Sequence, residues 1–308
     1  MGAHPHHSHA HGRGATGNVL IGSLVLTLAF VAGEAVAGWW AGSLALLSDA
    51  GHNFTDAFGL LLAAFAYYLE ARPGDSVKTF GYQRSGVLAA FVNAVMLVGF
   101  SVFLIWESYQ RLLAPQPIQE NIMLWVAVIG LVVNLTIAWG LGQGAHRHDL
   151  NIRATFLHQI GDAASCVAII AGAIVIRYTG WVSVDPILSG VMSVVIIWTA
   201  WDIFRDSLNI LLEGLPKGLN LAEVTEAIRL ARGVDEVHDL HIWSLGSEAR
   251  ALSCHLVIED MPPSESESIL TRVNGMLGER FGIHHTTIQF EHTRCVVADA
   301  CAGGKRLN

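Results

Sequence analysis

Six long apolar stretches constrain the fold of this chain more than any other feature of its sequence. Each approaches or exceeds the ~20 residues that an α-helix needs to cross a bilayer. We therefore predict a membrane α-helical bundle of six transmembrane helices, surrounded by the lipid bilayer. The stretches run approximately from Asn18 to Trp40, Ser43 to Leu69, Gly86 to Trp106, Asn121 to Leu141, Ile152 to Tyr178 and Trp181 to Phe204.

The composition agrees with a membrane location and excludes one class of partner. Of the 308 residues, 52% are hydrophobic and only 14% are charged, whereas an ordinary soluble domain has about 25% charged residues. The net charge of -8 provides no basic surface for nucleic acid, so we exclude nucleic acid as a partner. The four cysteines lie far apart or in the carboxyl-terminal tail and indicate no disulfide framework.

The basic residues of the loops predict how the helices are oriented. One side of the bundle holds eight of them and the other side two. Because Lys and Arg in short loops favour the cytoplasmic side of a membrane, we predict that both termini are cytoplasmic. The richer side holds Arg13, Arg72, Lys78, Arg84, Arg147, Arg153, Arg205 and Lys217, and the other side holds Arg111 and Arg177.

A small soluble domain follows the last apolar stretch. Its pattern predicts helix, strand, strand, helix and strand, an αββαβ order with one open sheet face. A domain this small has a limited core, so dimerisation through that face would help to complete it. The elements are expected at Leu221 to Arg232, Val237 to Leu245, Ala249 to Glu259, Ser264 to Phe281 and Thr286 to His292.

The chain therefore divides into four predicted segments. Residues 1–17 form a disordered cytoplasmic tail, whose five histidines could bind metal weakly. Residues 18–213 form the transmembrane domain, residues 214–292 the cytoplasmic domain, and residues 293–308 a flexible tail.

Two matching pairs of ionisable residues lie inside the predicted spans. The second span carries His52 and Asp56, and the fifth carries His158 and Asp162. The i, i+4 spacing places both members of a pair on one helix face. Ionisable residues inside a membrane are costly and usually mark a substrate path. Two imidazoles and two carboxylates, with no thiolate, suit tetrahedral Zn²⁺.

Each pair by itself has another interpretation, a buried His–Asp hydrogen bond that stabilises helix packing. The repetition of His-x-x-x-Asp-Ala in two separate spans favours a metal site instead. Asp49 lies one turn before His52 and shares its stripe. Three roles stay open for Asp49: an acceptor for the imidazole, a ligand that the ion meets on its way in, or a residue of the helix start after Ser48.

These residues occur in longer motifs that resemble the cation diffusion facilitator family, particularly its bacterial zinc, cadmium and cobalt efflux branch. The motifs are Leu-Leu-Ser-Asp-Ala-Gly-His-Asn-Phe-Thr-Asp at 46–56, Phe-Gly-Tyr-Gln-Arg at 80–84, the pair at 158–162, and His-Asp-Leu-His-Ile-Trp-Ser-Leu at 238–245. The resemblance implies a homodimer in the bacterial inner membrane, proton-coupled antiport, and a metallochaperone-like cytoplasmic domain. One departure is Gly86, where the family often has Glu, so any contact of that carboxylate is in doubt.

The cytoplasmic domain contains a second candidate site. Leu252, Cys254, Leu256 and Ile258 share one strand face, with Leu240, Ile242, Ile288 and Phe290 on the core side of the other strands. By this alternation His241, His255 and Glu291 converge on the open face. The family resemblance favours His238, His255 and either Glu291 or His292 instead. Cys295 and Cys301 are too widely spaced for a Cys-x-x-Cys motif, and their role stays open.

The ligand types also indicate a mechanism. Ligands must lose their protons to bind metal, so protons and Zn²⁺ compete for the site. Imidazole is the natural exchanging group near neutral pH. We therefore expect metal efflux by alternating access, with H⁺ as the counter-ion. A membrane zinc metalloenzyme or a metal sensor is the alternative, but no His-Glu-x-x-His motif is present, so we do not expect an enzyme. The preference among Zn²⁺, Cd²⁺ and Co²⁺ stays open.

Overall fold

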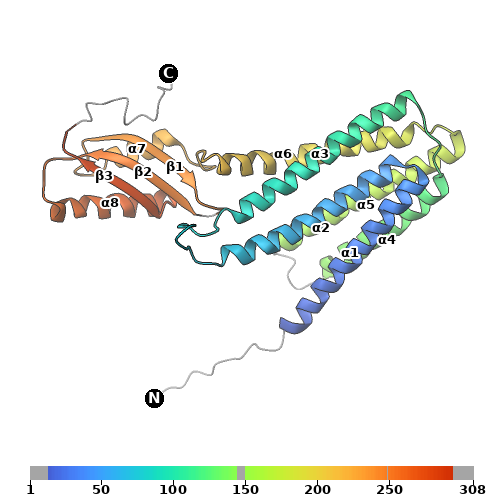
Figure 1. Cartoon of the computed structure of the whole chain (residues 1–308), viewed down its shortest axis with the longest axis horizontal. Helices are drawn as coiled ribbons and strands as arrows, with labels where there is room; N and C mark the ends of the chain where they lie inside the picture. The colour runs from blue at the N-terminus through green and yellow to red at the C-terminus, as the bar shows by residue number, and fades with distance from the viewer. Residues whose placement is uncertain (1–12, 144–149, 248, 294–308) are drawn as a thin grey trace, which may run out of the picture. The chain divides into compact units, whose positions relative to one another are not determined.

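A computed structural model describes residues 13–143, 150–247 and 249–293, and their side chains except at 13–26, 141–143, 150–152 and 154. The amino-terminal histidines, Cys295 and Cys301 lie outside the described residues. Six long helices come first along the chain (Figure 1). They are α1 (Arg13–Ala41), α2 (Leu44–Glu70), α3 (Ser85–Leu113), α4 (Glu120–Gln143), α5 (Leu150–Thr179) and α6 (Val184–Leu211).

Four of these helices, α3 to α6, are long and apolar enough to cross a membrane. The chain is therefore a multi-pass membrane protein. The side chains of α1 are described only from Thr27 to Ala41, which is shorter than a crossing requires. In α2, polar residues such as Asp49, His52 and Asp56 interrupt the apolar sequence. The full set of six spans stays a prediction.

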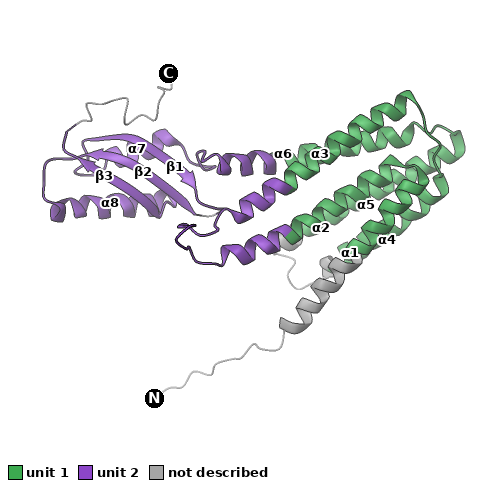
Figure 2. Ribbon diagram, in the orientation of Figure 1, with its two compact units in different colours: residues 1–61, 93–201 green, residues 62–92, 202–308 purple. Residues whose placement is uncertain are grey.

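The chain forms two compact units (Figure 2). The first contains residues 1–61 and 93–201, and the second contains residues 62–92 and 202–308. The boundaries cut through α2, α3 and α6, because the ends of these helices group with the carboxyl-terminal domain. The four segments predicted from the sequence were divided by hydropathy and not by contacts within the fold. Their boundaries stay a prediction.

The start of α2 is fixed by Asp185, at the beginning of α6. The side chain of Asp185 accepts hydrogen bonds from the backbone N–H groups of Leu44 and Ala45, at 2.7 and 3.2 Å, and from the hydroxyl of Ser43. The hydroxyl of Ser43 in turn accepts from the N–H of Leu46 at 3.2 Å. The first N–H groups of a helix have no partner within the helix, and a carboxylate also complements the helix dipole there. Asp185 therefore caps a helix to which it does not belong.

Loss of this cap should destabilise the bundle. We expect Asp185→Ala to lower the free energy of unfolding by about 1–2 kcal/mol, because buried N–H groups of α2 lose their acceptor. Asp185→Asn, which keeps one acceptor oxygen, should have an intermediate effect. Thermal unfolding of the purified protein, followed by circular dichroism, measures both. Asp202→Ala, at an exposed position of α6, is the control, and equal stability of the Asp185 and Asp202 variants would contradict the cap.

The carboxyl-terminal domain has the αββαβ order expected from its sequence pattern. Its elements are α7 (Leu221–Arg229), β1 (Glu236–Ser244), β2 (Arg250–Val257), α8 (Pro263–Phe281) and β3 (His285–Glu291). The sheet order is β1-β2-β3, with β1 antiparallel and β3 parallel to β2. Helix α8 ends at Gly282, whose φ of 64° is easy for glycine and strained for other residues.

The core of this domain lies between α7, α8 and one face of the sheet. Val224 of α7 and Leu277 of α8 are buried there together with Leu252, Cys254 and Leu256 of β2. The strand positions that alternation assigned to the core face, among them Leu240, Ile242, Ile288 and Phe290, all belong to this cluster. Burial raises the pKa of the Cys254 thiol to about 12. This thiol is therefore a packed core residue rather than a reactive one.

The start of α3 explains how the chain accommodates Gly86. Arg84 pairs with Glu213, with Nη2 and Oε1 3.2 Å apart, and also donates to the carbonyl of Ser244. The N–H of Gly86 donates to Oε1 of Glu70, and a Cβ at position 86 would lie 2.6 Å from that oxygen. A carboxylate from α2 thus occupies the space that a side chain at position 86 would need. The usual glutamate would meet another negative charge there.

Candidate metal centre

The two His-x-x-x-Asp pairs come from α2 and α5. Within each helix the i, i+4 spacing brings His and Asp together on one face, and the two faces meet. His52 and Asp56 lie on α2, and His158 and Asp162 lie on α5. The structure thus brings together all four residues that the sequence singled out, although about one hundred residues separate the two pairs along the chain.

Each histidine of this group contacts both aspartates. Nε2 of His52 lies 3.4 Å from Oδ2 of Asp56 and 3.7 Å from Oδ1 of Asp162. Nε2 of His158 lies 3.1 Å from Oδ2 of Asp56 and 3.5 Å from Oδ2 of Asp162. The two imidazole rings are 5.8 Å apart between centroids and meet edge to face.

These separations fit the edges of a tetrahedron. Zinc bonds of ~2.0 Å to nitrogen and oxygen place tetrahedral ligands ~3.3 Å from one another. The four nitrogen–oxygen distances, from 3.1 to 3.7 Å, are close to that value. In addition, the ligand atoms of His52, His158 and Asp162 all lie within 4.8 Å of one another. The arrangement could hold a divalent cation with small movements of its side chains.

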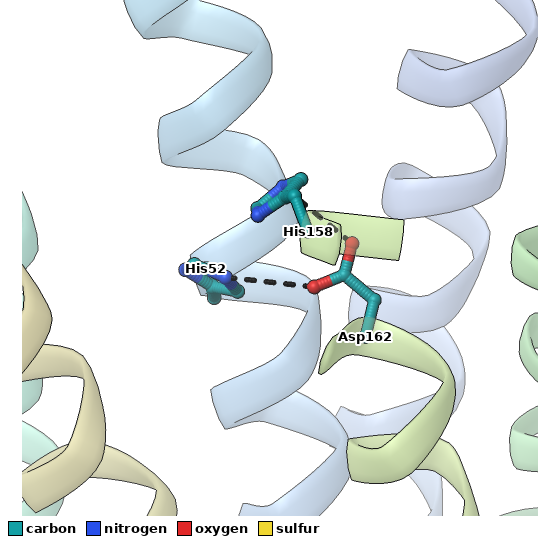
Figure 3. Close-up of side chains that lie close together, drawn as sticks. All are labelled: His52, His158 and Asp162. Atoms are coloured by element: carbon teal, nitrogen blue, oxygen red, sulfur yellow. Dashed lines mark ion pairs between the residues drawn. The ribbon is translucent and has the colours of Figure 1, made fainter. Parts of the chain in front are cut away.

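Burial differs across the group and gives it an open and a closed side. Figure 3 shows the two oxygens of the Asp162 carboxylate each joined by an ion pair to one imidazole, Oδ1 to His52 and Oδ2 to His158. Asp162 is buried, while 44% of the His158 side chain is exposed. Nδ1 of His52 and Oδ2 of Asp56 are buried atoms without a hydrogen-bond partner. A buried polar atom without a hydrogen-bond partner requires an explanation, and a bound ion is one that fits this group.

Asp49 lies outside this group of four. It is buried on α2, where its Oδ2 lies 3.9 Å from the sulfur of Cys166. The structure gives no ion pair between Asp49 and His52 among the described residues. One of the three roles predicted for Asp49 was to accept a hydrogen bond from the His52 imidazole. The described ion pairs do not support that role.

A second group of possible ligands lies on the sheet of the carboxyl-terminal domain. Glu291 joins two histidines: its Oε2 lies 3.2 Å from Nε2 of His238, and its Oε1 lies 3.0 Å from Nδ1 of His255. The two imidazole rings are 5.2 Å apart and meet edge to face. His292, at the end of β3, is exposed. The ligand atoms of His238, His255 and Glu291 lie within 4.8 Å of one another, so these three could hold a metal.

The structure places His241 outside this group, although strand alternation predicted it to be a member. The register shifts by one residue between His238, opposite His255, and His241, opposite Ser253. Asp239 stands in this bulge with a φ of 50°. Because of this extra residue, His238 pairs with His255 and shares its face, while His241 pairs with Ser253, two residues away from His255 on the same face of the sheet.

The sequence interpretation did not identify Asp239 as a neighbour of these histidines. Its two carboxylate oxygens lie 3.1 Å from Nε2 of His241 and 3.8 Å from Nε2 of His255. Asp239 thus connects His241 to the edge of the group. The only sequence signal was an aspartate between two strand histidines, because aspartate tolerates a left-handed backbone better than most residues.

Two family descriptions match the sequence. Residues 20–212 match the cation efflux transmembrane domain, and residues 216–293 match the cytoplasmic domain of cation efflux proteins. Together they cover most of the chain.

Several relatives match over nearly their full length. A cadmium, cobalt and zinc/H⁺-K⁺ antiporter of Bacillus velezensis is 38% identical, over 92% of this chain and 91% of the relative. The zinc transporter ZitB of Pectobacterium atrosepticum is 37% identical, over 94% and 90%. The metal cation efflux system protein CzcD of Cupriavidus metallidurans is 40% identical, over 96% and 92%.

Proposed function

The chain belongs to the cation efflux family, and from that membership we propose that it exports a divalent transition metal, chiefly Zn²⁺, through its helix bundle in exchange for protons. The family and these relatives are metal transporters rather than enzymes. A membrane metalloenzyme is thereby set aside.

The observation that carries the proposal is the group His52, Asp56, His158 and Asp162. Two nitrogens and two carboxylate oxygens at tetrahedral separations suit Zn²⁺, and the group lies on helices of the transmembrane domain. Residues that hold a metal within the membrane domain are suited to carrying it rather than to storing it. The partly exposed imidazole of His158 would be the first ligand to meet the ion.

The choice of metal rests on ligand type. Imidazole and carboxylate ligands accept Zn²⁺ and Co²⁺ well, while Cd²⁺ is softer and gains more from sulfur. The relatives named above are described as transporters of zinc, or of cadmium, cobalt and zinc. We therefore propose Zn²⁺ as the principal substrate, with Cd²⁺ and Co²⁺ as further substrates.

Proton coupling follows from the ligands as well. Each ligand must be deprotonated to hold the metal, so binding of protons and of metal exclude one another. The Bacillus velezensis relative is named as a zinc/H⁺-K⁺ antiporter, which supports exchange against a monovalent cation. We propose that metal loads from the cytoplasm, that the bundle then opens to the outside, and that protonation of His52 or His158 releases the ion. The protonated site returns inward.

The same proposal includes the setting of the protein. Six spans with both termini in the cytoplasm would place the carboxyl-terminal domain where cytosolic metal can reach it. A bacterial inner membrane is the location that the bacterial relatives support. The name of the cytoplasmic family domain supports a homodimer.

In this homodimer, the group His238, His255 and Glu291 would sense metal and tune transport. We expect the double substitution His255→Ala and Glu291→Ala to weaken metal binding by the cytoplasmic domain about tenfold or more, and to lower flux only in part. The partial effect follows because these ligands lie outside the transmembrane site. Metal titration and vesicle flux measure the two effects.

His241→Ala is the matched control for this prediction, because His241 contacts Asp239 and lies outside the ligand group. It should leave metal affinity of the domain close to that of the unaltered protein. Complete loss of flux in a folded His255 and Glu291 double variant would show that the domain is obligatory rather than modulatory.

A single experiment tests the proposed function as a whole. The purified protein is placed in sealed vesicles, and uptake of Zn²⁺, Cd²⁺ and Co²⁺ is followed with and without a pH gradient. We expect saturable flux that is fastest for Zn²⁺ and that responds to the gradient. Binding of metal without flux would favour a sensor and overturn the transport proposal.

A further inference from the structure

Three ligand atoms of the cytoplasmic group are buried and have no hydrogen-bond partner within the described part of the chain. They are Nε2 of His238, Nδ1 of His255 and Oε2 of Glu291. A metal ion shared by the three residues would satisfy all of these atoms at once, because imidazole nitrogens and carboxylate oxygens are ordinary ligands of Zn²⁺. The group therefore fits a metal, and His255 would bind it through Nδ1.

The other ring nitrogen of His255 lies near a second carboxylate, that of Asp239. Nε2 of His255 is 3.8 Å from Oδ2 of Asp239, whereas Nδ1 is 3.0 Å from Oε1 of Glu291. A neutral imidazole carries its proton on one of its two nitrogens, and the nitrogen that bonds to a metal must be without it. Binding through Nδ1 therefore leaves the proton on Nε2, from which it can be donated to Asp239 in a hydrogen bond.

The bulge in β1 is what brings Asp239 to this place. Successive side chains of a regular strand point to opposite faces of the sheet, so Asp239 would point away from the face of its neighbour His238. The bulge lets both residues approach His255, since His238 pairs with His255 and Asp239 lies beside its Nε2. Asp239 has a φ of 50°, which is uncommon for residues other than glycine. Such backbone conformations are concentrated at functional sites.

The contacts of the Asp239 side chain do not point to a role in shaping the backbone. Its Oδ1 lies 3.1 Å from Nε2 of His241, which leaves Oδ2 for His255. Among the hydrogen bonds of the described residues, none runs from a backbone N–H group to this carboxylate. The carboxylate therefore does not cap the bulge, and the side chains that it approaches are two imidazoles.

We propose that Asp239 is a positioning residue of the cytoplasmic metal site, which holds the imidazole of His255 with Nδ1 toward the metal. Asp239 does not bond to the metal itself, because it faces the nitrogen on the other side of the ring. Carboxylates that accept from the far nitrogen of a metal-binding histidine fix the orientation of the ring, and their loss weakens metal binding about 10–100-fold. The inference deepens the proposed function, because it rests on the metal site that the proposal places at His238, His255 and Glu291.

Asp239→Gly tests this role, because it removes the carboxylate without forcing the backbone. Zn²⁺ affinity is measured by competition with a coloured chelator, in full-length protein in detergent that carries Asp162→Ala to remove the transmembrane site. We expect Asp239→Gly to weaken zinc affinity about tenfold or more. Thermal unfolding of the metal-free protein should stay close to that of the parent, since glycine adopts a φ of 50° easily but adds freedom to the unfolded chain. A residue that only shaped the bulge would change stability instead.

Asp239→Asn is the conservative variant, because asparagine also tolerates a left-handed backbone and keeps one acceptor oxygen. A neutral amide accepts a weaker hydrogen bond than a carboxylate does. Asp239→Asn should therefore bind zinc more weakly than the parent and more tightly than Asp239→Gly. The matched control is Asp260→Asn, which alters an exposed carboxylate of the same domain and should leave the affinity unchanged.

The outcomes separate the positioning role from the proposals on which it rests. Zinc affinity equal to that of the parent in both folded Asp239 variants would overturn the positioning role and leave the metal site in place. Equal affinity of the parent and of His255→Ala would overturn the cytoplasmic metal site, and the positioning role with it. Neither result bears on the proposed transport, which vesicle flux through the chain with Asp162 intact tests by itself.

Discussion

Replacing Asp162 with alanine should abolish metal flux while leaving the protein in the membrane. Asp162 is buried and contacts both histidines of the proposed transport site, at 3.7 and 3.5 Å. We expect an ion that loses one of its four protein ligands to bind too weakly for transport, because water replaces a fixed ligand less effectively. Asp56→Ala and His158→Ala should have the same effect, because the Asp56 carboxylate lies between both histidines and His158 lies between both aspartates. Zinc flux into sealed vesicles, at matched protein content, provides the measurement.

The control for these three substitutions is Asp202→Ala, which removes an exposed carboxylate of α6. It should retain flux close to that of the unaltered protein. Membrane fractionation and size-exclusion chromatography show whether each variant is inserted and folded. Any of the three variants that transports normally would remove its residue from the ligand set.

The grouping of the four proposed ligands could be predicted from the sequence because helices repeat regularly. A spacing of four residues places His52 beside Asp56 and His158 beside Asp162 whatever the rest of the fold is. The matching of the two pairs then indicated that α2 and α5 face one another. The distances between the pairs, from 3.1 to 3.7 Å, depend on helix packing and required the structure.

The cytoplasmic group shows where such periodicity fails. Strand alternation correctly predicted the core positions Leu252, Cys254 and Leu256 of β2, and Ile258 just after it. It did not predict the position of His238, because one extra residue near Asp239 shifts the register of β1 and brings His238 opposite His255. A bulge depends on local backbone geometry and on the partner strand, so a single aspartate in the sequence is not enough to predict it. The family resemblance pointed to His238, which is the histidine that the structure brings beside His255 and Glu291.

Glu34 shows a different limit of the sequence. A lone acidic residue in the first apolar stretch looks like an interruption of a membrane span. Its proximity to Asp49 comes from the packing of α1 against other helices, which no spacing within α1 predicts. The same holds for Asp185, whose carboxylate caps the start of α2 from the beginning of α6. Contacts between helices that are distant in sequence therefore account for most of what the structure adds.

An inward-directed proton gradient should accelerate metal export, and metal movement should in turn acidify the cytoplasmic compartment. In oriented vesicles, the compartment facing the cytoplasmic side would show this acidification with a trapped pH dye. The physical reason is that His52 and His158 hold either a metal or a proton, so protons arriving from outside displace the ion. Among side chains, imidazole is the one that ordinarily exchanges its proton near neutral pH. The pH dependence of flux should pass through that region.

His52→Asp gives this prediction a direction that can be checked. A carboxylate releases its proton at lower pH than an imidazole, so the pH dependence of flux should move toward lower pH. The altered site, with three carboxylates and one imidazole, is also harder, so transport should shift away from Zn²⁺ toward ions that prefer oxygen ligands, such as Mn²⁺. His241→Ala, outside both ligand groups, is the matched histidine control and should leave the pH dependence in place. Flux that neither responds to the gradient nor moves protons would refute antiport, while the tetrahedral ligand set would still account for a metal pathway.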